Sequence, residues 1–183
     1  MYMSDSAHYS FVEELKNGRQ VTIRAIRPDD RGQIAVALQD LSPESFYLRT
    51  FSPKRQLSES DLRNLTEIDF RNVVALVAVV KEGDQVLIVG GGRYIRMGDG
   101  DADRAEVAFL VDDGHQGLGI GSRIFKHLLA IARSSGIVKF EAEVLPANDG
   151  MLRLFERSGL PVSKKRTEDT VHVEMSLGEG NDR

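Results

Sequence analysis

The sequence predicts an α/β fold, of the α+β type, in which helices cover the faces of a mixed sheet. Three observations lead to this prediction. A nearly unbroken apolar run at 73–80 is typical of a strand buried on both faces. The apolar stretch 105–111 leads through a glycine-rich turn directly into an amphipathic helix. No linker and no internal repeat divides the 183 residues, so we expect one domain.

The domain is expected to span residues 19–178, with an extension at 1–18 packed on it and a disordered tail at 179–183. The extension is polar, and we expect it to be irregular. Its apolar residues are possible anchors on the body of the domain: Tyr9, Phe11, Val12 and Leu15.

Capping and turn residues divide the first half of the domain into short elements. Alternating polar and apolar residues predict a strand at 21–25. Serine or aspartate caps predict three helices after it, at about 31–40, from Ser42 and from Ser58.

Strands dominate the second half. They are expected at 73–80, 86–97, 105–111, 140–145, 161–166 and 170–177, with helices at 120–134 and 149–158 and a turn at 98–103. Three consecutive glycines, Gly90 to Gly92, lie inside one strand pattern and indicate a bulge or a close approach of another backbone.

Composition excludes several classes of protein. The chain has no cysteine, which rules out disulfides, thiolate metal sites and a cysteine nucleophile. A net charge of −4 argues against a general nucleic-acid binder. No apolar run approaches the roughly 20 residues of a membrane span, and the N-terminus lacks a signal-peptide pattern, so we expect a cytoplasmic protein. The four histidines show no metal-ligand spacing, and no metal is expected.

The glycine-rich turn has the pattern Gln116-Gly117-x-Gly119-x-Gly121. Its spacing differs from the dinucleotide fingerprint, and it lacks the lysine of a Walker loop. Backbone N–H groups at the start of a helix, together with the helix dipole, bind phosphate. The turn therefore predicts a phosphorylated ligand, although glycines used only for a sharp turn would give the same pattern.

A second motif follows the next strand: Asn148-x-x-Met151-x-x-Leu154-Phe155-Glu156-Arg157-x-Gly159. The two motifs in this order resemble the GCN5-related N-acetyltransferase (GNAT) superfamily over nearly the whole chain. The resemblance implies a mostly antiparallel sheet of about seven strands, splayed between the fourth and fifth. It also implies direct transfer of an acetyl group from acetyl-CoA to an amine.

The resemblance assigns the coenzyme site by position. The diphosphate loop falls on Gln116, Gly117, Leu118, Gly119, Ile120, Gly121 and Ser122, and the pantetheine arm on Phe109, Leu110 and Val111. Asn148 would contact the arm, and it can equally be the N-cap of the following helix. Phe155 would pack against the arm, and it can equally be a core residue.

Glu106 matches the catalytic glutamate of the family. A lysine amine must lose a proton before it attacks a thioester, and a carboxylate raised toward neutrality by burial can accept that proton. The alternative is a surface glutamate paired with Arg104 or Arg93.

One position departs from the family pattern. Many members have a tyrosine that protonates the leaving thiolate, and here that position is Phe155. Water, Tyr47 or Tyr94 could substitute. A thiol has a pKa of about 8.5, so its thiolate can also leave without an acid.

The segments 21–30 and 41–51 resemble a narrower GNAT group of protein lysine acetyltransferases, which often act on acyl-CoA synthetases. This implies a protein lysine as acceptor, an acyl-CoA synthetase as partner, and a monomer or dimer. Two alternatives stay open. Acidic residues in the acceptor groove, such as Asp61, Glu67 and Asp69, would favour a small amine. A coenzyme-binding regulatory module without turnover would be consistent with Phe155.

Overall fold

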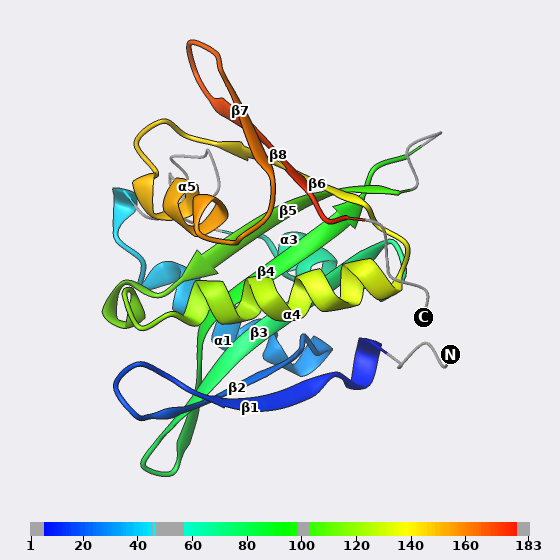
Figure 1. Ribbon diagram of the computed structural model, residues 1–183. Coiled ribbons are helices and arrows are strands. Elements are labelled where there is room, and N and C mark those ends of the chain that lie inside the picture. The colour runs from blue at the N-terminus through cyan, green and yellow to red at the C-terminus, as the bar shows by residue number, and fades with distance from the viewer. Residues whose placement is uncertain (1–5, 45, 47–56, 99–102, 179–183) are drawn as a thin grey trace.

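The computed structural model describes residues 6–44, 46, 57–98 and 103–178. One eight-stranded sheet runs through this part of the chain in the order β1-β2-β3-β4-β5-β6-β8-β7 (Figure 1). The strands are β1 Ser10–Glu14, β2 Gln20–Ala25, β3 Val73–Glu82, β4 Gln85–Arg96, β5 Arg104–Val111, β6 Lys139–Val144, β7 Val162–Arg166 and β8 Val171–Ser176. The α-helices are α1 Arg31–Gln39, α3 Glu59–Thr66, α4 Ile120–Ser134 and α5 Asp149–Glu156. Short 3-10 turns cover Ser6–His8, Pro28–Asp30 and Asp113–His115.

All neighbouring strands are antiparallel except β5 and β6, which are parallel. The predicted mixed sheet is therefore confirmed, with one strand more than expected. The predicted helix from Ser42 and the turn at 98–103 fall partly on residues outside the described ranges. No helix in the described residues is long and apolar enough to cross a membrane.

The additional strand is β1. No strand is expected before residue 21, and this expectation is wrong for Ser10–Glu14, which pair with Gln20–Arg24. The pattern was missed because β1 is an edge strand with mostly exposed side chains, so it lacks the alternation that marks a half-buried strand. Of the expected anchors, Leu15 is buried, whereas Val12 is exposed.

Two hydrophobic layers enclose β3. On one face, α4 lies across the sheet, and on the other face lie α1 and α3 (Figure 1). Residues 74–80 are all buried, which confirms the prediction from the unbroken apolar run. The larger core lies under α4, whose buried stripe includes Ile120, Ile124, Leu128 and Ile131.

The glycines of β4 allow α4 to approach closely. A β-carbon on Gly92 would lie 2.5 Å from Phe109 Cδ1 and 2.7 Å from Ile124 Cγ2. The pairing of β3 with β4 also shifts register between Ala78 and Val79, opposite Gly90 and Ile88. The register shift confirms the bulge expected from the glycine run, whereas the close approach at Gly92 is made by side chains and not by another backbone.

The sheet opens between β5 and β6. The two strands pair only from Arg104 to Glu106 on β5 and from Lys139 to Glu141 on β6. From Val107 to Val111, β5 has β4 as its partner on one edge and no β6 partner on the other. This confirms the predicted splay and leaves backbone N–H and C=O groups of β5 facing the opening.

Candidate active site

The glycine-rich turn joins β5 to α4 in a conformation that only glycine adopts easily. Gly117 and Gly119 have φ of 80° and 86°, in the left-handed region. Gly119 is the N-cap of α4, and no side chain caps this end. The first N–H groups of a 15-residue helix therefore point out of the turn without a side-chain acceptor. This is the geometry that binds an anion.

A cavity of about 480 Å³ lies between this turn, β5 and the start of α5. Most of the residues predicted to bind coenzyme line it: Phe109, Leu110, Val111, Gln116, Gly117, Gly119, Ile120, Gly121, Ser122 and Asn148. Two do not. Leu118 packs against the main core, and Phe155 lines the next cavity.

That second cavity, of about 360 Å³, lies in the opening between β5 and β6. Glu106 lines it from β5 and Glu143 from β6. Asn148 and Met151 line both cavities, so the cavity beside the glycine-rich turn and the cavity beside Glu106 adjoin each other. Asn148 also accepts a hydrogen bond from the Met151 N–H at 3.2 Å, which confirms it as the N-cap of α5.

Glu106 is exposed, so the expectation that this carboxylate is buried is wrong for the described structure. Strand register opposes it to Ile95 and places it on the same face as Arg93. Burial lowers the pKa of the Arg93 guanidinium, and the negative charge of Glu106 opposes this effect. The second suggested partner, Arg104, pairs with Glu141 and with Glu174.

Phe155 is a core residue that also borders the cavity beside Glu106. It is buried, and its ring meets those of Phe109 and Phe125 edge to face, with centroids 6.1 and 5.9 Å apart. Of the suggested replacement acids, Tyr94 is fully buried under α4 and lines neither cavity, because its register opposite Val107 turns it to the α4 face. Tyr47 lies outside the described residues.

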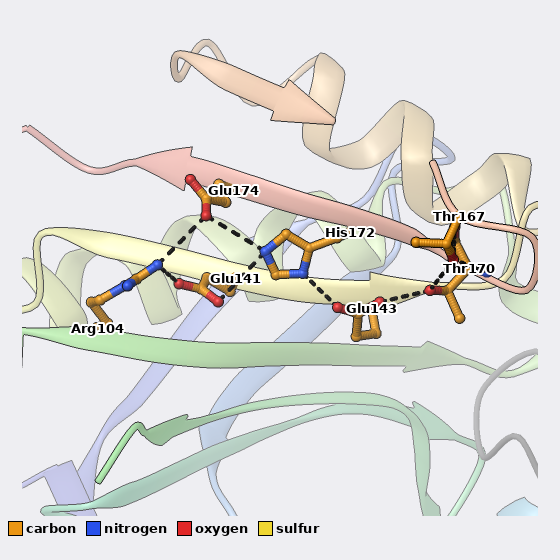
Figure 2. A network of polar contacts seen from close by, with 7 residues as sticks. All are labelled: Arg104, Glu141, Glu143, Thr167, Thr170, His172 and Glu174. Atoms are coloured by element: carbon orange, nitrogen blue, oxygen red, sulfur yellow. Dashed lines mark hydrogen bonds and ion pairs between the residues drawn. The ribbon is translucent and has the colours of Figure 1, made fainter. Parts of the chain in front are cut away.

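A polar network that the sequence did not reveal borders the Glu106 cavity (Figure 2). His172 Nδ1 lies 2.5 Å from Glu143 Oε1, and Thr170 Oγ1 donates to Glu143 Oε2 at 2.9 Å. His172 Nε2 lies 3.6 Å from Glu141 Oε2 and 3.6 Å from Glu174 Oε1. The two glutamates of β6 lie about 30 positions before their partners on β8, so only the pairing of the two strands brings these residues together.

Part of this network has the composition of a metal site. One ligand atom each from Glu141, His172 and Glu174 lie within 4.8 Å of one another. The Arg104 guanidinium pairs with Glu141 and lies 3.5 Å from Glu174, so a cation of the protein itself already neutralises these carboxylates (Figure 2). The histidine spacing in sequence gave no sign of this cluster.

On the opposite face of the sheet from α4, an apolar groove of about 450 Å³ lies between α1, α3 and the strands. Leu110 lines both this groove and the cavity beside the glycine-rich turn. Of the acidic residues considered for a small amine, only Asp61 lines the groove, and its carboxylate accepts from the Ser58 N–H in a helix cap.

The other two acidic residues have structural roles. Glu67 pairs with Arg31. Partial burial would raise the pKa of Asp69, but hydrogen bonds from the N–H groups of Val73, Arg71 and Asn72 outweigh it and hold the pKa at about 2. The three carboxylates therefore do not converge on one acceptor pocket.

Comparison with known proteins gives consistent matches. The sequence pattern of the acetyltransferase (GNAT) family matches residues 36–160. An acetyltransferase of Pseudomonas aeruginosa is 30% identical over 163 residues, which are 89% of this chain and 86% of that protein. Acetyltransferase Pat of Mycolicibacterium smegmatis is 32% identical over 146 residues, 80% of this chain but only 43% of Pat. The solved GNAT domain of S. lividans PAT is 35% identical, with a TM-score of 0.83 over 96% of this chain and 99% of that domain.

Proposed function

Because the chain belongs to the acetyltransferase (GNAT) family, we propose that it transfers the acetyl group of acetyl-CoA directly to the ε-amino group of a protein lysine. Acetyl-CoA is the cosubstrate typical of the family. The observation that carries the proposal is the pair of adjoining cavities, which we take as one groove leading from the glycine-rich turn past Asn148 to Glu106.

The groove matches the chemistry of the coenzyme along its length. The diphosphate binds at the uncapped start of α4, where N–H groups and the helix dipole favour negative charge. The pantetheine arm then runs along Phe109, Leu110 and Val111, on the edge of β5 that β6 leaves unpaired. Its amides resemble peptide groups and bond to this edge as an added strand would.

Glu106 acts as the general base in this proposal. It removes a proton from the lysine ammonium, and the free amine attacks the thioester carbonyl. The carbon–sulfur bond then breaks, and the electron pair leaves on the coenzyme thiolate. The nitrogen loses its second proton as the amide forms, and water carries this proton to the thiolate. Because Glu106 is exposed, a lysine on another protein can reach it.

A protein lysine is favoured over a small amine by two observations. The acidic residues that would hold a small amine are engaged in a helix cap, an ion pair and a turn. The narrower resemblance in the N-terminal segments is to protein lysine acetyltransferases, and two of the matched proteins are named Pat. We propose an acyl-CoA synthetase as the class of protein substrate.

The test is the Glu106→Gln variant, with Glu168→Gln as a matched control on an exposed turn. Both proteins are incubated with labelled acetyl-CoA and a host lysate, and modified lysines are identified by mass spectrometry. Loss of a general base is expected to lower the rate by about 100-fold or more, with coenzyme binding retained. Unchanged lysine acetylation in Glu106→Gln would refute this role. Binding of CoA without turnover on any amine would favour a regulatory module.

A further inference from the structure

The N-terminal hairpin of β1 and β2 is attached to the glycine-rich turn. The Lys16 N–H donates to the Leu118 carbonyl at 3.4 Å. Arg123, in the first turn of α4, donates to the carbonyls of Glu14 and Gly119, the latter at 3.2 Å. The tip of the hairpin is therefore held against the segment whose N–H groups face the coenzyme cavity.

Further contacts hold the hairpin on α4. His127 accepts or donates at both ring nitrogens, with Nδ1 2.6 Å from Tyr9 Oη and Nε2 2.6 Å from Glu13 Oε1. The second oxygen of Glu13 lies 3.2 Å from Arg123 Nε. His127 is buried, so these contacts fix the hairpin relative to the helix.

The side chain of Lys16 extends toward the phosphate-binding turn. It lines the coenzyme cavity, and its Cε lies 3.5 Å from the position that a β-carbon on Gly119 would occupy. In the described structure, no carboxylate lies within ion-pair distance of Lys16. By contrast, Arg19 on the same hairpin pairs with Glu82 at 3.1 Å, and Arg123 pairs with Glu13.

We propose that the Lys16 ammonium binds the diphosphate of the coenzyme, so that the N-terminal hairpin forms one wall of the coenzyme site. The inference rests on the proposed use of acetyl-CoA. Backbone N–H groups supply directional hydrogen bonds to phosphate but only partial charge, and a lysine adds a full positive charge. Its position beside Gly119, at the start of α4, assigns it to the diphosphate rather than to the 3′-phosphate at the far end of the nucleotide.

The test compares CoA with dephospho-CoA, which keeps the diphosphate and lacks the 3′-phosphate. Affinities are measured by titration calorimetry for the full chain and for Lys16→Met, Lys16→Arg and Arg19→Met. We expect Lys16→Met to weaken both ligands by about 5- to 20-fold, as the loss of an exposed charge-assisted contact does. Lys16→Arg should restore most of the affinity, and Arg19→Met should bind as the unchanged protein does.

The outcomes separate this inference from the proposed function. If the unchanged protein does not bind CoA, both fail. If it binds CoA and Lys16→Met binds equally well, only the role of Lys16 is wrong. A loss that is seen with CoA and absent with dephospho-CoA would overturn the assignment to the diphosphate. Lys16 is exposed, and the hydrogen bond to Leu118 uses its backbone, so thermal unfolding of Lys16→Met should match that of the unchanged protein.

Discussion

Removal of the Asp30 carboxylate should destabilise the domain more than any surface substitution. Both oxygens of Asp30 accept from the Arg24 guanidinium at 2.8 Å, and Oδ2 also accepts from the Arg27 N–H at 2.8 Å. The side chains of Asp30 and Arg24 are 6% and 13% exposed, so water screens the pair little. Asp30→Ala leaves a guanidinium nearly buried without its counter-charge, which costs about 3–5 kcal/mol of unfolding free energy.

Urea unfolding at neutral pH measures this cost, with Arg24→Met and the double variant closing a thermodynamic cycle. The double variant should recover part of the loss, because it removes the uncompensated charge. If Asp30→Ala lowers the free energy of unfolding by less than about 1 kcal/mol, the pair does not behave as a buried one, because an exposed ion pair contributes that little.

The same pair predicts a pH dependence. Burial alone would raise the pKa of Asp30, but the hydrogen bonds and charges of Arg24 and Arg27 outweigh it and lower the pKa. A carboxyl whose pKa is lower in the folded state stabilises the fold above its unfolded pKa of about 3.9. The difference in unfolding free energy between the unchanged protein and Asp30→Ala should therefore shrink as the pH falls below about 4 and through the pKa of Asp30 in the folded state. A difference in unfolding free energy that stays constant down to pH 2 would contradict the stabilising role of the ionised Asp30 carboxylate.

Two further pairs of substitutions test the packing and the role of Asn148. Gly92→Ala places a β-carbon within 3 Å of the buried side chains of Phe109 and Ile124, and it should lower the free energy of unfolding by about 1–3 kcal/mol, as measured in urea. Gly98→Ala is the control: it has open space around it and should lower the free energy of unfolding by less than about 0.5 kcal/mol. Asn148→Ala should lose about 1 kcal/mol as an N-cap, and Asn148→Ser should keep that stability. If Asn148 also contacts the coenzyme, calorimetry should show weaker acetyl-CoA binding in both variants; unchanged binding in Asn148→Ser would limit the residue to capping.

Local patterns predicted the elements that bury one face or begin with a cap. The helix at 120–134 has an apolar stripe at helical spacing and occurs with the expected bounds. Asn148 and Ser58 cap the helices expected after them. These predictions succeed because caps and periodicity depend on residues only a few positions apart.

Other features depend on pairing between distant segments. The edge strand β1 carries exposed side chains, so its extended form depends on hydrogen bonds to β2. Glu106 is the last residue of β5 that pairs with β6, so its place at the opening of the sheet depends on where this pairing ends. The network around His172 forms because β6 and β8 align Glu141 with Glu174 and Glu143 with His172.

The sequence by itself determined the order of helices and strands and the two motifs that carry the family resemblance, since these depend on residues a few positions apart. Only the tertiary structure decided that the two motifs line the same cavity, that Glu106 lines the adjoining one and that Tyr94 is turned into the core. It also placed Lys16, more than 100 positions before Gly119, beside the glycine-rich turn. The physical reason is that strand register and helix packing set these positions, and both are decided by the whole core rather than by neighbouring residues.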